Sequence, residues 1–236
     1  MIDNINEILY TPIDSEPVPN YDLNKLLDWV KNHQAQELAV RRDSSKHETL
    51  ANVYPWDIVY PKHNGKWKFD FKEEFPEIAN YFSSAFKLNE KDINSVVLLP
   101  IKNNFTGTGF WHNDPDPYGL RIYLENEEPG EFLLIKPTVE PYNEHRSFGP
   151  GSVDPVIPNI KLQNVIHSAK LKNSRQVFYL NTTRAVHAVQ VPQLGKLRIA
   201  VIVTVFGNAD INNHLNNLIC TSADKFSEHA LYWHPE

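Results

Sequence analysis

Three side chains that could bind a metal ion lie in two segments that are far apart in the sequence. His112 and Asp114 lie two residues apart within 109–115, and His187 lies within 179–189. Residues i and i+2 of a β-strand point to the same face, so His112 and Asp114 can present a nitrogen and an oxygen to one point. With His187 they offer two imidazoles and a carboxylate, which occupy one triangular face of an octahedral ion and leave three positions open. This donor set suits Fe(II).

Each of these residues also has an ordinary structural interpretation. A His-x-Asp triplet occurs often by chance, and this one could be a polar loop that precedes Pro115. His187, in an apolar strand, could be a core histidine with a hydrogen-bond partner. Structural zinc is disfavoured, because a closed tetrahedral site would call for several cysteines and the chain contains only Cys220.

A possible anion-binding residue follows the second segment. Arg198 comes eleven residues after His187, at the start of the apolar stretch 197–206. Strand alternation places Arg198 on one face with Ala200, Ile202 and Thr204, and places only aliphatic residues on the other. We expect the aliphatic face to pack against helices and Arg198 to point into a barrel interior. A buried guanidinium needs an anionic partner, either a dicarboxylate cosubstrate held by two hydrogen bonds or an Asp or Glu of the protein.

A second arginine lies close behind the first metal segment. Arg121 follows His112 by nine residues within 119–125, and alternation places Tyr123 on the same face. Both side chains are therefore expected to enter the same interior as Arg198. An error of one residue in the strand phase would instead turn both to the exterior.

These residues lie among short predicted strands that follow predicted helices. Apolar spacing predicts helices over 22–33, with Asp22 as N-cap, and over 76–86, with Pro76 in the first turn. Strands are predicted near 95–101, 107–113, 118–125, 131–136, 176–181, 185–191 and 197–206. This order fits a mainly β barrel or sandwich with helices on one outer face. The proline-rich segment 137–175 is either a lid over the site or a plain surface excursion.

Composition is that of an ordinary globular protein. The chain has 236 residues, 41% hydrophobic and 22% charged, with a formal net charge of −6. Lys and Arg are dispersed, which disfavours nucleic-acid binding. A single cysteine favours a reducing compartment, and neither an N-terminal signal nor a membrane-length apolar run is visible. We therefore expect a cytoplasmic protein that contacts neither nucleic acid nor membrane.

In its combined pattern the chain resembles the Fe(II)/2-oxoglutarate-dependent dioxygenase superfamily. The pattern is His112-x-Asp114, Arg121, His187 and Arg198 in this order, across roughly 95–207. The Arg-Ile-x-Leu phrase at 121–124 and the Arg-Ile-Ala-Val strand at 198–201 look most like the aspartyl/asparaginyl β-hydroxylase-like group. That group takes in bacterial proline hydroxylases, and the prolyl 4-hydroxylase-like group is similar as well.

The resemblance implies a fold, a site and a reaction. The fold would be a double-stranded β-helix (jelly-roll) core at 95–207 in a single domain 1–236, with a mixed N-terminal region over residues 1–94 and a tail over residues 208–236. The metal ligands and catalytic residues would be His112, Asp114 and His187. Arg198 would bind the distal carboxylate of 2-oxoglutarate and Arg121 would assist, with Tyr123 beside them where the β-hydroxylase group often has His. Fe(II), 2-oxoglutarate and dioxygen would serve in hydroxylating a C–H bond, with release of succinate and carbon dioxide.

The substrate and the alternatives follow from analogy alone. A small polar substrate is favoured, either a free amino acid or an amino-acid residue in a peptide. The oligomeric state is open. The main rival is a cupin-like barrel that binds metal without oxygenase turnover, and in it Arg198 would have no ligand-binding role. A repair demethylase acting on nucleic acid is disfavoured by the dispersed basic residues.

Overall fold

The structure is a computed structural model of the chain. It describes residues 5–42, 59–68, 70–100, 107–108, 118–127, 131–135, 145–147, 153–155, 165–170, 175–183, 186–191 and 197–232. The helices are α1 (Leu23–Arg42), α3 (Phe71–Glu74), α4 (Pro76–Ser84) and α5 (Ala209–Lys225), with 3-10 turns η1 (Ile5–Glu7) and η2 (Glu90–Asp92).

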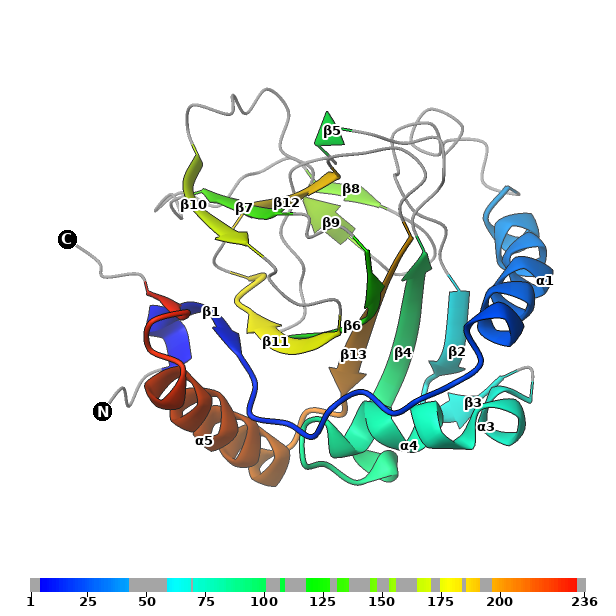
Figure 1. Ribbon diagram of the computed structural model, residues 1–236, viewed down its shortest axis with the longest axis horizontal. Coiled ribbons are helices and arrows are strands. Elements are labelled where there is room, and N and C mark those ends of the chain that lie inside the picture. Colours follow the sequence, from blue (N-terminus) through cyan, green and yellow to red (C-terminus); the bar gives the residue numbers. More distant parts are fainter. Residues whose placement is uncertain are drawn as a thin grey trace.

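The described strands fall into three sheets, and two of these sheets form the body of the fold (Figure 1). Their bounds are β1 (Ile8–Pro12), β2 (Val59–His63), β3 (Lys66–Trp67), β4 (Ile93–Pro100), β5 (Gly107–Thr108), β6 (Gly119–Asn126), β7 (Glu131–Ile135), β8 (His145–Ser147), β9 (Val153–Pro155), β10 (Val165–Lys170), β11 (Gln176–Leu180), β12 (Val186–Val191), β13 (Arg198–Val205) and β14 (Leu231–Tyr232). The large sheet has the order β14-β1-β11-β6-β13-β4-β2-β3. The small one has the order β10-β7-β12-β5, and β8 pairs with β9.

The strand order defines a jelly roll. Eight strands alternate between the two sheets in antiparallel pairs: β4 with β13, β5 with β12, β6 with β11, and β7 with β10. The first of the eight thus pairs with the last, the second with the seventh, and so on inward, which is a long hairpin rolled into two facing sheets. Figure 1 shows the four-stranded sheet lying across the concave side of the large one. The predicted double-stranded β-helix core is confirmed.

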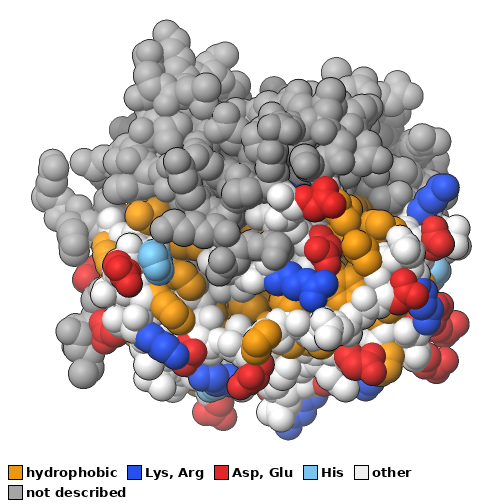
Figure 2. Space-filling model, viewed as in Figure 1, with side chains coloured by type: hydrophobic (Ala, Val, Ile, Leu, Met, Phe, Trp, Pro, Cys, Tyr) orange, Lys and Arg blue, Asp and Glu red, His pale blue; other side chains and the backbone are white. Residues whose placement is uncertain are grey.

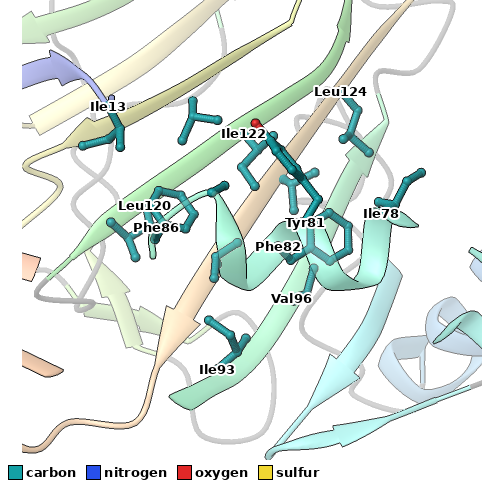
Figure 3. Packing of buried hydrophobic residues seen from close by; sticks show 14 of the residues in the cluster. Ile13, Ile78, Tyr81, Phe82, Phe86, Ile93, Val96, Leu120, Ile122 and Leu124 are labelled. Atoms are coloured by element: carbon teal, nitrogen blue, oxygen red, sulfur yellow. The ribbon is translucent and has the colours of Figure 1, made fainter. Parts of the chain in front are cut away.

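Helices cover the outer face of the large sheet, as predicted for those of the N-terminal region, and the C-terminal helix α5 lies on the same face. α3, α4 and α5 lie beneath the sheet in Figure 1, and α1 lies at its β2 side. Figure 3 shows Leu120 and Ile122 of β6 packed with Phe82 of α4 and with Phe86, which follows the end of that helix. The aliphatic positions of β13, Ile199, Val201 and Val203, are fully buried in this same cluster. Burial of apolar side chains between sheet and helices therefore supplies the main core.

Capping groups fix the ends of two of these helices. The backbone N–H of Lys25 donates to the Asp22 carboxylate (3.0 Å), which confirms Asp22 as the N-cap of α1. The Asn208 side chain accepts from the backbone N–H of Ile211 (2.9 Å) at the start of α5. None of the described helices is long and apolar enough to cross a membrane.

A β-bulge near the end of β6 changes which residues face the interior. Tyr123 pairs with Ala200 and Glu125 pairs with Ile199. Two successive residues of β13 are therefore matched by three residues of β6, and Leu124 is the extra, bulged residue. The Tyr21 hydroxyl donates to Glu125 Oε1 (2.8 Å) and lies 3.2 Å from the Leu124 carbonyl oxygen. The bulge is thus held from the helix-covered side.

The termini hold regular structure that the sequence patterns did not predict. In 1–94, β1 joins the large sheet beside β11, and β2 and β3 extend its other edge. The tail 208–236 contributes α5, which packs against β1. The described segments of 137–175 form β8, β9 and β10. Whether 137–175 acts as a lid, and whether the chain is one domain, stay predictions.

On the face seen in Figure 2, acidic and basic side chains are interspersed over the described surface. Among the described residues, exposed or half-exposed ion pairs join Lys25 to Glu74 (3.6 Å), Lys72 to Glu90 (2.5 Å) and Lys225 to Asp14 (2.6 Å). Such pairs contribute little to stability individually, about 0–1 kcal/mol each.

Candidate functional site

The predicted polar residues of β6 and β13 share the face of the large sheet that points away from the helices. Arg121 pairs with Ile202 and Tyr123 with Ala200, while their neighbours Ile122 and Val201 pair within the helix-packed core. Directly paired residues project to the same side of a sheet. Arg121, Tyr123 and Arg198 therefore lie on the interior face between the sheets, and the predicted strand phase is confirmed.

Tyr123 and Arg198 are in direct contact in this interior. Nη2 of Arg198 donates a hydrogen bond to the Tyr123 hydroxyl, and the guanidinium carbon lies 4.6 Å from the ring centroid. Tyr123 is fully buried and Arg198 is 5% exposed. Burial lowers the pKa of the Arg198 guanidinium to about 9, which leaves it charged at neutral pH. The interior thus contains a desolvated cation that an aromatic ring and a hydroxyl orient.

Arg121 adds a second buried guanidinium to the same face. Its side chain is 5% exposed, and Nη1 donates to the backbone carbonyl of Leu120 (3.2 Å). Arg121 lies directly opposite Ile202 of β13 and Phe178 of β11, and Arg198 lies directly opposite Asn126. Like charges in a low-dielectric interior repel one another, so an anion bound on this face would be stabilised by both.

An aromatic row extends this face toward β1. The Phe178 ring lies between Tyr123 and Tyr10, with centroids 5.4 and 5.6 Å away respectively. Nε2 of Gln176 donates to the Tyr10 hydroxyl (2.9 Å), and burial raises the pKa of that phenol to about 12. The row forms an apolar floor with polar groups at its edges, which is a common lining for a small-molecule site.

The proposed metal ligands are only partly described. His187 lies on β12 of the small sheet, opposite Leu134, and is 3% exposed. His112 and Asp114 lie outside the described residues. Within the described part of the chain, no group of three His, Cys, Asp or Glu side chains could hold a metal ion. The three-ligand site therefore stays a prediction.

Two polar residues of the interior face were missed in the sequence. Asn126 is directly opposite Arg198, and Gln176 is directly opposite Tyr123. Gln176 begins its strand and could have been found by alternation from Phe178 once β11 was paired with β6. No sequence signal places Asn126 there, because alternation from Arg121 puts it on the helix side and only the bulge at Leu124 reverses this.

Comparisons with known proteins identify no family for this chain. No protein-family model matches the sequence, and no curated protein matches it. Among solved structures, the L-ribose isomerase of Cellulomonas parahominis, solved with L-psicose, is similar across 79% of this chain and 84% of its own at 9% identity, with a TM-score of 0.35. A likeness this distant carries no argument about function.

Strand order and interior chemistry together define the class. The chain is a mainly β jelly-roll protein with helices on one outer face and a cationic, aromatic-lined interior. Jelly-roll barrels include both cupin-like proteins and the oxygenase superfamily that the sequence resembles. Fold alone does not choose between them.

Proposed function

We propose that this chain is an Fe(II)/2-oxoglutarate-dependent oxygenase that hydroxylates a C–H bond of a small polar substrate, such as an amino acid or an amino-acid residue in a peptide. The observation that carries the proposal is the buried Arg198 guanidinium, held by Tyr123 on the interior face of a jelly roll. A charged, oriented donor in such an interior is suited to a carboxylate ligand.

Each interior residue has a role in this proposal. Arg198 binds the distal carboxylate of 2-oxoglutarate, and Tyr123 fixes the plane of the guanidinium through its hydroxyl and ring. Arg121, further along β6, contributes positive potential near the metal-bound end of the cosubstrate. The row of Phe178 and Tyr10 excludes water from the carbon chain between the two ends.

The donor set offered by the sequence fits Fe(II). His112, Asp114 and His187 would hold the ion, and His187 is buried on the sheet that faces Arg198. When bound, the iron would supply the activation of dioxygen and the oxidation of the substrate, coupled to decarboxylation of 2-oxoglutarate to succinate. The protein's own part is to orient the cosubstrate and keep the site dry.

The test is anaerobic addition of Fe(II) and 2-oxoglutarate to the purified chain. The expected result is a visible metal-to-ligand charge-transfer band, lost in His187→Ala, followed by succinate release in air with an amino-acid or peptide substrate. A wild-type protein that binds Fe(II) but gives neither the band nor succinate would refute the oxygenase proposal.

A cupin-like barrel that binds metal without oxygenase turnover is the second candidate. The observation in its favour is that a protein group, Tyr123, already engages Arg198, as it would if the arginine were structural. In that case Arg198→Met would leave metal binding and any ligand affinity unchanged. Under the oxygenase proposal the same variant keeps Fe(II) binding but loses affinity for 2-oxoglutarate.

A further inference from the structure

The β6 bulge places a buried amide beside the candidate carboxylate-binding arginine. Asn126 is directly opposite Arg198 in the register between β6 and β13, so both side chains project from the interior face. Glu125, by contrast, pairs with Ile199 of the helix-packed core and bonds Tyr21 and Arg175 on that side. The bulge therefore turns the carboxylate away from Arg198 and the amide toward it.

The Asn126 amide is buried, and its polar atoms have no hydrogen-bond partner among the described residues. The residue is 3% exposed, and neither Oδ1 nor Nδ2 has a hydrogen-bond partner within the described part of the chain. Leaving a buried amide without partners is costly, and native proteins rarely keep one unless a ligand, a water or a function needs it. Gln176, on the same face beside Tyr123, likewise has a buried Oε1 without a described partner.

We infer that Asn126 is a ligand-binding residue that donates Nδ2–H to the same distal carboxylate that Arg198 binds. The inference rests on the proposed function and extends it to the specificity of the site. A guanidinium and an amide on directly opposed positions can supply donors to both oxygens of one carboxylate. Either rotamer of the amide about its terminal torsion still leaves one donor group on the interior face.

This arrangement favours cosubstrates that carry a second carboxylate. 2-Oxoglutarate and 2-oxobutyrate share the keto and metal-binding carboxylate groups, but only 2-oxoglutarate has the distal carboxylate. Loss of the Asn126 donor should therefore weaken the binding of 2-oxoglutarate and leave the binding of 2-oxobutyrate unchanged. If Asn126 had only a structural role, its loss would disturb the whole site and weaken the binding of both ligands.

The experiment measures both affinities by anaerobic calorimetry on the Fe(II)-loaded full chain, with wild type and Asn126→Ala. We expect the variant to bind 2-oxoglutarate about tenfold or more weakly, the loss of one hydrogen bond to a charged group, with unchanged 2-oxobutyrate affinity. Asn126→Asp places a carboxylate beside Arg198, so the affinity for 2-oxoglutarate should fall about a hundredfold. Melting temperature should be unchanged or higher in Asn126→Ala, because an unsatisfied amide is removed.

Thr204→Ser is the matched control. Thr204 lies on the same face of β13, six residues from Arg198 or about 20 Å along the strand, so this variant should bind both ligands as wild type does. If Asn126→Ala does not fold, Asn126→Ser, which keeps a small polar side chain, takes its place.

The outcomes separate this inference from the proposed function. Wild-type binding of 2-oxoglutarate with no loss in the Asn126 variants would overturn the role of Asn126 and leave the oxygenase proposal standing. Equal weakening of both ligands would overturn it in favour of a structural role. If wild type binds no 2-oxoglutarate but binds glutarate or succinate in an Asn126-dependent way, the oxygenase proposal fails and the carboxylate site stands. Binding of none of these carboxylates would overturn both.

Discussion

The Arg198 guanidinium carbon lies 4.6 Å from the centroid of the Tyr123 ring, and both side chains are buried between the two sheets. The ring and hydroxyl of Tyr123 thus orient the Arg198 guanidinium. A cation held in a dry interior interacts with an anion far more strongly than one at the surface. The pair is therefore the natural centre for predictions about ligand binding.

Arg198→Met should greatly weaken the binding of 2-oxoglutarate while preserving the fold. Methionine approximates the length of the side chain but removes the charge and all five donors. We expect affinity to fall by about a hundredfold or more, the effect of losing a bidentate charged contact. Calorimetry measures the affinity, and circular dichroism checks the fold. Arg198→Lys keeps the charge without the planar guanidinium, so its affinity for 2-oxoglutarate should lie between those of wild type and Arg198→Met. Full affinity in Arg198→Met would mean that the arginine is structural.

Tyr123→Phe tests whether the hydroxyl positions the guanidinium. The variant keeps the ring contacts with Arg198 and Phe178 and removes only the hydrogen-bond acceptor. Removing a partner of a buried charged donor costs about 1.5–3 kcal/mol, so the urea midpoint should fall accordingly. 2-Oxoglutarate affinity should fall about tenfold through the less ordered guanidinium. Unchanged stability and affinity would show that the ring alone suffices.

Gly119→Ala should unfold the barrel or destabilise it severely. A Cβ at Gly119 would lie 1.9 Å from the Leu180 carbonyl oxygen and 2.9 Å from Thr182 Cγ2, where β6 and β11 approach each other. The contact is with backbone, which cannot rotate away, so we expect a loss above about 4 kcal/mol or no soluble protein.

Gly207→Ala is the control for that variant. Among the described residues, no atom lies within 4 Å of a Cβ built at Gly207, so the free energy of unfolding should change by no more than about 0.5 kcal/mol. Urea unfolding of the two proteins side by side measures the difference. Equal stability of the two would contradict the close approach of β6 to β11.

The sequence was most informative where alternation is regular. Alternation in the sequence of β13 predicts one apolar face and one mixed face. The structure places Ile199 and Val201 in the helix-packed core and Arg198 on the interior face. Seven predicted strands correspond to β4, β5, β6, β7, β11, β12 and β13. Hydrophobic burial determines these positions, and the periodicity of apolar residues in the sequence indicates which residues are buried.

Pairing between distant segments was not readable in the same way. α5 is a different case, because its buried residues Ile211, Leu215 and Leu218 recur at helical spacing, a local pattern from which the helix could have been predicted. The bulge at Leu124 depends on register with β13 and on the Tyr21 hydroxyl, which comes from more than a hundred residues earlier. Asn126 could not be placed in the interior without that information. The metal triad remains a sequence prediction, since His112 and Asp114 lie outside the described residues.

Tyr10 should make the stability of the barrel fall at alkaline pH. Burial raises the pKa of its phenol from 10.0 to about 12, so above pH 10 the unfolded chain releases this proton while the folded chain retains it. The unfolded state then binds fewer protons, and the free energy of unfolding decreases with rising pH. The contribution is complete below pH 10, and about 1.4 kcal/mol of it is lost by pH 11.

Tyr10→Phe isolates this contribution from the other groups that titrate in the same range. At pH 8 the variant should be about 1 kcal/mol less stable than wild type, because Nε2 of Gln176 loses its acceptor. Between pH 9 and 11 wild type should lose stability faster, so the difference between the two urea midpoints should shrink to nearly zero. Other tyrosines titrate equally in both proteins and cancel. Parallel curves across this range would mean that the Tyr10 phenol ionises in the folded protein as it does in the unfolded chain.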